Sequence, residues 1–314
     1  MQSEEIRGIA EALGQTVVAT QTLAGGFSHE TSLLTLASDR VVARLGGPDP
    51  VIEAAVMTAA RRHVPVPQVL LVVPSAAGGG TRPAMVLEYV EGTPLSQVLS
   101  EDESDGAALG ELGAEVGRTV AGIGAVAFDC RGFFTDGQLA VCEEPSWSQQ
   151  LPEVAATCMD ATAQARLDPA TRQAWVDLCT LHAPALTQID SHTRLVHSDI
   201  NPKNILVTRA HGTWRVSAVL DWEFSYSGCP YADPANMVRF GADYPARFLD
   251  GFRTGFAEHR PADLAPVEDW AYLGRIMDMF ALSDLMTRPV GHPIAEQAAE
   301  LIQRWIAEGV PRSI

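Results

Sequence analysis

The sequence lacks the features that mark membrane, secreted and disulfide-stabilised proteins. No apolar run approaches the ~20 residues that a membrane-spanning helix needs. The acidic first residues, 1–5, show no secretory signal pattern. The five cysteines are odd in number and form no C-x-x-C pair, so we expect reduced cysteines and no zinc site. These absences predict a cytoplasmic protein without a membrane segment.

Positive charge is also scarce. Lys203 is the only lysine, and 22 basic residues stand against 39 acidic ones, which gives a net charge of −17. Most of the excess negative charge lies after residue 92. Such a chain repels the phosphates of nucleic acids, so we expect no nucleic-acid partner. A cationic small molecule would be attracted, although solubility alone explains the charge equally well.

The length and composition are those of an ordinary globular protein. The chain has 314 residues, of which 46% are hydrophobic and 19% are charged. This is enough for a large core, and it favours two lobes over one.

Residues 195–207 have a polar centre between two apolar flanks. This pattern predicts a buried strand, a functional loop and a second buried strand. Asp199 and Asn204 lie in the loop, and the next apolar run ends at Asp221. Two oxygen ligands can hold Mg²⁺ while a third group accepts a hydroxyl proton during phosphoryl transfer. Asp and Asn also cap turns, but capping does not explain three such groups at strand ends.

The pattern His197-x-Asp199-x-x-x-x-Asn204, followed by Asp-Trp-Glu at 221–223, resembles the catalytic segment of the aminoglycoside phosphotransferase family. These antibiotic kinases are related to choline kinases and protein kinases. The resemblance implies that Asp199 is the catalytic base, that Asn204 and Asp221 bind Mg²⁺, and that His197 supports the loop. No D-F-G or A-P-E stretch follows Asp221, which disfavours a protein kinase.

The same resemblance implies an α+β, bilobal, protein-kinase-like fold. A small β-rich lobe, residues 1–92, would bind the nucleotide and end in the hinge. A larger and mostly helical lobe, residues 93–314, would carry the catalytic and acceptor groups. In that lobe we expect Asp233 to cap a helix and to have no chemical role.

A glycine-rich turn between two predicted strands, 17–23 and 31–36, could bring backbone N–H groups close to phosphates. Gly25 and Gly26 permit that approach, and Ser28 could donate its hydroxyl. A Gly-Gly hairpin alone is more often only a hairpin. Its place ahead of the catalytic segment, and the family resemblance, favour a nucleotide loop.

Arg44 stands where kinase-like folds usually carry a lysine, and Glu53 on the next predicted helix is its candidate partner. A guanidinium can hold phosphate oxygens through two parallel hydrogen bonds. The alternative is a surface ion pair of little energetic value, but apolar neighbours predict that Arg44 is partly buried. By resemblance, hinge backbone groups from Glu88 to Val90 would bind the purine.

The resemblance implies that ATP is the phosphate donor, with GTP as an option. Together with the acidic second lobe, it points to a small cationic acceptor. We expect an antibiotic, either an aminoglycoside or a basic cyclic peptide such as capreomycin or viomycin, to be inactivated at a hydroxyl. Choline, homoserine, a sugar, a macrolide and a non-catalytic binding role stay open, as does the choice between monomer and homodimer. A single carboxylate is more often only a surface group, but those that face inward could contact the acceptor. The candidates are Glu143, Glu144, Glu153, Asp160, Asp269, Asp278 and Asp284.

Overall fold

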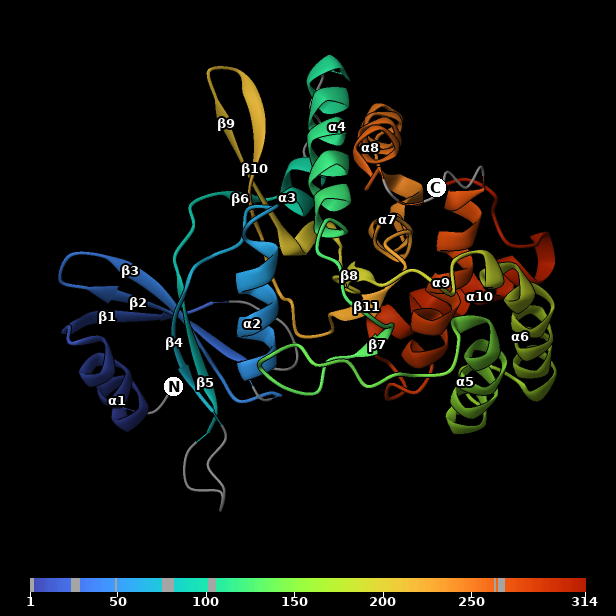
Figure 1. The fold of residues 1–314 in the computed structure, drawn as a ribbon, viewed down its shortest axis with the longest axis horizontal. Coiled ribbons are helices and arrows are strands. Elements are labelled where there is room, and N and C mark those ends of the chain that lie inside the picture. Colours follow the sequence, from blue (N-terminus) through green and yellow to red (C-terminus); the bar gives the residue numbers. More distant parts are fainter. Residues whose placement is uncertain are drawn as a thin grey trace.

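The computed structural model describes residues 3–23, 29–48, 50–74, 82–100, 106–262, 264 and 269–314. A β-sheet forms one end of the molecule and a group of helices forms the other (Figure 1). This arrangement confirms the α+β, protein-kinase-like fold predicted above. Gly25, Gly26 and Ser28 lie outside the described residues. The boundary between lobes at residues 92 and 93 stays a prediction.

The N-terminal sheet has five antiparallel strands in the order β1-β2-β3-β5-β4. Alternate residues of β5 face opposite layers, as the two-residue period of a strand requires. Ala84 and Val86 pack in a small core with α1, whereas Met85 and Leu87 join the main core with α2. The bounds are α1 Ser3–Leu13, β1 Val17–Thr22, β2 Glu30–Leu36, β3 Arg40–Leu45, α2 Pro50–Ala60, β4 Val69–Val73 and β5 Ala84–Glu88.

The chain leaves β5 and immediately pairs with strands of the C-terminal region. β6 (Thr93–Pro94) lies beside β9 (Ile205–Ala210), and β9 pairs in turn with β10 (Thr213–Val219). A second small sheet has the order β7-β11-β8, with bounds β7 Gly132–Phe133, β8 Arg194–Val196 and β11 Tyr226–Gly228. These two sheets present the ends of β8, β9 and β10 to the space beside α2 (Figure 1).

Helices α4 and α8 pack unusually closely because glycines line their contact. A Cβ atom added at Gly117 would stand 2.2 Å from the Phe252 carbonyl oxygen, and one at Gly113 would stand 2.1 Å from that of Phe248. Figure 1 shows the two helices side by side. The helices of this region are α3 Leu95–Ser100, α4 Gly106–Ile123, α5 Trp147–Ala161, α6 Pro169–His182, η1 Ala183–Gln188, η2 Pro202–Asn204, α7 Ala232–Met237, η3 Gly241–Asp243, α8 Ala246–His259, α9 Trp270–Leu285 and α10 Pro293–Glu308.

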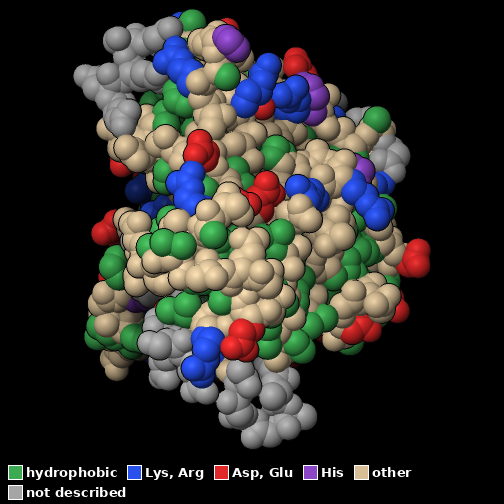
Figure 2. Space-filling view, turned by 90° about the vertical axis from the view of Figure 1, so that its left-hand side faces the viewer, with side chains coloured by type: hydrophobic (Ala, Val, Ile, Leu, Met, Phe, Trp, Pro, Cys, Tyr) green, Lys and Arg blue, Asp and Glu red, His purple; other side chains and the backbone are tan. Residues whose placement is uncertain are grey.

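The surface around the sheet carries charges of both signs. In Figure 2 basic and acidic side chains are interspersed, with hydrophobic side chains between them. Two of the exposed ion pairs here are Arg82–Glu5 and Arg40–Glu91. Within the described ranges, no helix has the length and apolar character that crossing a membrane would require.

Candidate active site

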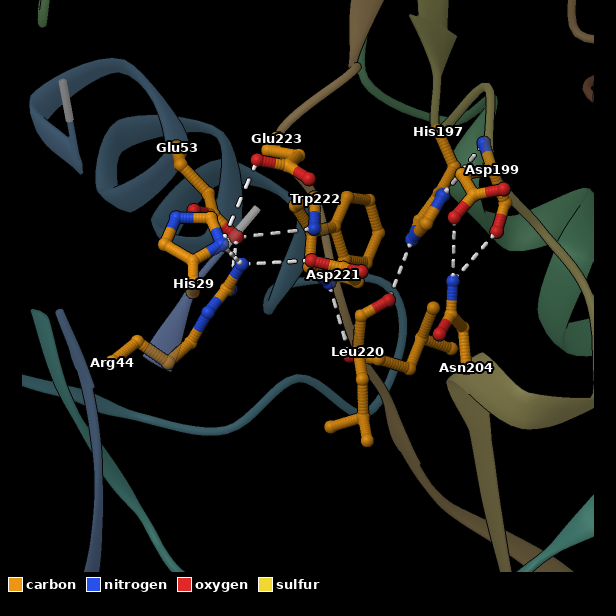
Figure 3. Close-up of polar contacts among 11 residues, drawn as sticks. His29, Arg44, Glu53, His197, Asp199, Asn204, Leu220, Asp221, Trp222 and Glu223 are labelled. Atoms are coloured by element: carbon orange, nitrogen blue, oxygen red, sulfur yellow. Dashed lines mark hydrogen bonds and ion pairs between the residues drawn. The ribbon is translucent and has the colours of Figure 1, made fainter. Parts of the chain in front are cut away.

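The loop after β8 is held by its histidine. His197 is fully buried, its Nδ1 accepts the Asp199 N–H at 3.2 Å, and its Nε2 lies 2.9 Å from the Leu220 carbonyl oxygen (Figure 3). Since Nδ1 accepts, Nε2 carries the proton and donates to Leu220. Burial lowers the pKa of His197 to about 4, which keeps the ring neutral. His197 therefore ties the loop to the residue before Asp221.

Asp199 and Asn204 face each other across this loop. The Asn204 Nδ2 donates to the Asp199 Oδ2 and to its carbonyl oxygen, both at 2.9 Å. Asn201 adds a contact at 3.3 Å to Oδ1. Burial, together with the negative charge of Asp221, raises the pKa of Asp199 to about 6. Because the amide nitrogen of Asn204 points at Asp199, its amide oxygen is left as the atom that could bind a cation.

Asp233 anchors the same loop, which corrects the expectation that it caps a helix. Tyr231 occupies the N-cap of α7, and Asp233 lies inside the first turn, almost fully buried. Its Oδ2 accepts the His197 N–H at 3.0 Å and its Oδ1 accepts the Ser198 N–H at 2.9 Å. Ser198 has φ +72°, so the backbone turns sharply where Asp233 holds it. Burial raises the pKa of Asp233 to about 7.

A second polar cluster centres on Arg44. Its ion pair with Glu53 is the pair predicted from the sequence. The Arg44 Nη1 lies 2.6 Å from the Glu53 Oε1, and the pair is buried. The second partner of Arg44, the Asp221 Oδ1 at 2.7 Å from Nη2, was not predicted. Burial alone would lower the pKa of Arg44, but Glu53 and Asp221 raise it overall. The guanidinium therefore stays charged and links the sheet, α2 and the end of β10.

Glu53 also fixes the segment after Asp221. Its Oε1 accepts the Trp222 N–H at 3.2 Å, and the Trp222 ring packs 4.5 Å from the His197 ring, centre to centre. Figure 3 shows the result: the Arg44 cluster lies on one side of residues 220–222 and the Asp199 loop lies on the other. Asp221 itself has φ +69°, which projects its carboxylate from the end of β10.

His29 is a site residue for which sequence reasoning assigned no role. Its Nδ1 lies 2.9 Å from the Arg44 Nη2 and 3.7 Å from the Glu223 Oε2. His29, Asp221 and Glu223 each offer a ligand atom, and these atoms lie within 4.8 Å of one another. Burial, followed by the charge of Arg44, lowers the pKa of His29 to about 4. Its position directly after the glycine-rich turn was the available signal.

These donors suit a hard divalent cation. Magnesium prefers carboxylate and amide oxygens, and Asp221, Glu223 and Asn204 supply them. Of the two carboxylate oxygens of Asp221, it is Oδ1 that the Arg44 guanidinium contacts. The other carboxylate oxygen of Asp221 is therefore not engaged by Arg44.

Comparison with known proteins agrees with this geometry. The sequence profile of the phosphotransferase enzyme family matches residues 19–270. The chain belongs to this phosphotransferase family. It is accordingly a small-molecule kinase that phosphorylates a hydroxyl group. No curated protein sequence gives a significant match.

Solved structures show the same fold as this phosphotransferase at low sequence identity. A thermostable mutant of aminoglycoside phosphotransferase APH(4)-Ia, in ternary complex with ADP and hygromycin B, has a TM-score of 0.71 and 16% identity, over 98% of this chain and 100% of that one. The GDP complex of an aminoglycoside 2′-phosphotransferase-IIIa mutant has a TM-score of 0.60 and 14% identity, over 98% and 94%. A protein provisionally assigned as a fructosamine-3-kinase, from Haemophilus somnus 129PT, has a TM-score of 0.60 and 14% identity, over 98% and 97%.

The backbone of Glu88, in the segment predicted as the hinge, is engaged with β4. The Glu88 N–H donates to the Gln68 carbonyl at 2.8 Å, and its side chain accepts the Gln68 N–H at 3.0 Å. The Glu88 N–H is thus already engaged, and the other backbone groups from Glu88 to Val90 stay a prediction for the purine. Arg61 approaches the Glu88 carboxylate at 3.5 Å, so this side chain points toward the connection between α2 and β4.

The candidate acceptor carboxylates of the phosphotransferase do not gather into one acidic cleft. Asp269 and Asp284 are exposed and pair with Arg312 and Arg288. Asp278 points inward, but Arg239 neutralises it at 2.5 Å. The remaining candidates lie in or near α5, where Glu143, Glu153 and Asp160 are exposed and Glu144 is half-buried.

Proposed function

We propose that this phosphotransferase transfers the γ-phosphate of ATP to a hydroxyl of a small cationic molecule. The observation that carries the proposal is the placement of two groups around residues 220–222. The carboxylate of Asp199 stands on one side, and the Arg44–Asp221 ion pair stands on the other. A base, a cation site and a phosphate-binding guanidinium are the parts that phosphoryl transfer needs.

Asp199 is the proposed catalytic base. With a pKa of about 6 it is ionised at neutral pH yet basic enough to accept a hydroxyl proton as the phosphoryl group transfers. Asn204, Asn201 and the Asp233-anchored backbone fix its position. Such positioning contributes much of the rate in phosphoryl transfer, because little covalent chemistry is left to the protein.

Asn204 and Asp221 are the proposed magnesium ligands, with Glu223 close enough to assist. When bound there, Mg²⁺ would supply positive charge against the negative charge that develops on the phosphate oxygens. Arg44, held by Glu53, would meet the phosphates as a fork of donors. Gly25, Gly26 and Ser28 stay predictions for the phosphate loop, as do the backbone groups from Glu88 to Val90 for the purine.

The acceptor is proposed from charge and from fold relatives. A net charge of −17 attracts cations, and APH(4)-Ia of the same fold is named for an aminoglycoside and holds hygromycin B. We therefore propose an aminoglycoside or a basic cyclic peptide, inactivated by phosphorylation. Choline, homoserine, a sugar and a macrolide are the alternatives. A second protein of the same fold was solved with GDP, so GTP is tested together with ATP as the phosphate donor. A cytoplasmic location and a monomer or homodimer stay predictions.

The test is nucleotide turnover with a panel of acceptors. Release of ADP or GDP would be followed with Mg²⁺ present, using aminoglycosides, capreomycin, viomycin, a macrolide, choline and homoserine. We expect stimulation by a cationic antibiotic and a loss of about 100-fold or more in Asp199→Asn, the size of a general-base contribution. Asp250→Asn, an exposed carboxylate of the same region, is the matched control and should keep full activity. Stimulation by none of the antibiotics would refute the proposed acceptor class.

A further inference from the structure

His29 joins two carboxylates in a cluster that the mechanism proposed above uses only in part. Its Nδ1 lies 3.7 Å from the Glu223 Oε2, and the side chains of His29 and Glu223 are only 9% and 4% exposed. Together with Asp221 they offer three ligand atoms that all lie within 4.8 Å of one another. Figure 3 shows this cluster on one side of residues 220–222 and Asn204 on the other. The cluster therefore shares only Asp221 with the pair formed by Asn204 and Asp221.

The ring of His29 presents a lone pair to this cluster. Its Nδ1 lies 2.9 Å from the Arg44 Nη2, and a guanidinium can only donate, so Nδ1 must accept. The same Nη2 donates to the Asp221 Oδ1 at 2.7 Å. The Nδ1 of His29 and the Oδ1 of Asp221 thus already converge on one positively charged nitrogen, as the ligands of a metal ion would.

Arg44 does not balance the negative charge of this region. The carboxylates of Glu53, Asp221 and Glu223 stand against the single guanidinium of Arg44, so these four side chains carry a formal charge of −2, three carboxylates against one guanidinium. Buried charge is costly unless it is paired, and a divalent cation would supply the missing charge. Only the Nη2 of Arg44 would have to move, because Nη1 is held separately by the Glu53 Oε1 at 2.6 Å.

We propose that His29, Asp221 and Glu223 form a divalent-cation site with one nitrogen ligand, which takes a first-row transition ion in preference to Mg²⁺. This deepens the proposed function, and it rests on that function for its role in phosphoryl transfer. Imidazole favours transition ions, whereas the preferred ligands of Mg²⁺ are oxygens. The pair Asn204 and Asp221 offers oxygens for metal binding, so the two sets of ligands should differ in the ion that they select.

The test is electron spin-echo spectroscopy of Mn²⁺ bound to the full chain. Nucleotide is left out, so that all ligands come from the protein and from water. Protein with ¹⁵N-labelled histidine is compared with unlabelled protein. We expect a ¹⁴N modulation from a coordinated ring nitrogen, which should be lost on labelling. Bound Mn²⁺ without this modulation, or no binding of Mn²⁺, would overturn the site.

A substitution at His29 separates metal ligation from hydrogen bonding to Arg44. His29→Asn keeps an acceptor for the guanidinium but removes the ring nitrogen. It should abolish the modulation and weaken Mn²⁺ binding about 10- to 100-fold, with Mg²⁺ binding within about threefold, as expected for the loss of an imidazole ligand. His63→Ala, which removes an exposed histidine, is the matched control and should keep the modulation. Unchanged Mn²⁺ binding in His29→Asn would reduce His29 to a residue that orients Arg44.

The double variant Arg44→Gln with Glu53→Gln tests the competition between guanidinium and metal ion. It removes one positive and one negative charge together, so the carboxylates of Asp221 and Glu223 keep the formal charge of the cluster at −2. Mn²⁺ should bind about 10-fold more tightly, because the charged hydrogen bonds of Nη2 no longer compete for the same atoms. Weaker binding would show that the metal does not use the atoms that Arg44 contacts, and would overturn the site.

These measurements do not depend on turnover, so the two proposals can fail separately. Histidine-bound Mn²⁺ in a protein that phosphorylates no member of the acceptor panel would refute the antibiotic-kinase function. The cation site would then stand without its role in phosphoryl transfer. Turnover in a protein whose Mn²⁺ has no histidine ligand would overturn the cation site and leave the proposed function standing.

Discussion

Asp233→Asn should remove part of the pH dependence of stability. Burial raises the pKa of Asp233 from an ordinary value of 3.8 to about 7. Native protein therefore binds this proton more tightly than unfolded protein does. Between about pH 4 and pH 7 the native state holds a proton that the unfolded chain has lost, so rising pH favours unfolding at this residue. The stability that protonated Asp233 contributes is fully present below the unfolded-state pKa of 3.8. It is lost as the pH rises through the native-state pKa of about 7.

The magnitude follows from the size of the shift. A shift of about 3 pKa units corresponds to on the order of 4 kcal/mol at 1.36 kcal/mol per unit. Asparagine does not titrate, so the stability of wild type relative to Asp233→Asn should fall by up to this amount from pH 4 to pH 8. The two hydrogen bonds from His197 and Ser198, at 3.0 and 2.9 Å, are weakened in the variant at every pH.

The assay is urea unfolding followed by tryptophan fluorescence at a series of pH values. Taking the difference between wild type and variant cancels the titration of all other groups. Asp243→Asn, which changes an exposed carboxylate, is the control variant. A flat difference for Asp233→Asn, or one in which wild type gains stability as pH rises, would refute the argument from burial.

Three further predictions follow from the packing and the site. Gly117→Ala should destabilise the protein by about 1–3 kcal/mol in urea, because its Cβ would stand 2.2 Å from the Phe252 oxygen, whereas Gly8→Ala, with nothing within 4 Å, should not destabilise it. Arg44→Lys should raise the nucleotide KM about 10-fold, because one ammonium cannot reproduce the hydrogen bonds to Glu53 and Asp221; an unchanged KM would remove Arg44 from the phosphate site. EDTA should abolish turnover and added Mg²⁺ should restore it, while turnover that persists without the metal would argue against Asn204 and Asp221 as ligands.

The strands and the catalytic segment were predictable because they depend on local pattern. The two strands predicted at 17–23 and 31–36 correspond to β1 and β2, because the β-propensity of a short run is a local property. The loop between β8 and β9 was evident from its polar centre between buried flanks. The Arg44–Glu53 pair was also accessible, because it joins consecutive elements only nine residues apart.

Contacts between distant segments were not predictable. Arg44 meets Asp221 across 177 residues, and Asp233 reaches back 36 residues to hold the loop rather than capping its own helix. Asp278 was one of several candidate carboxylates for an acceptor cleft, but Arg239 neutralises it across 39 residues. Local sequence was enough to place polar residue types at the strand ends, since burial periodicity is a local property. Which charges meet depends on the packing of distant elements, because packing sets the direction in which each element points its side chains.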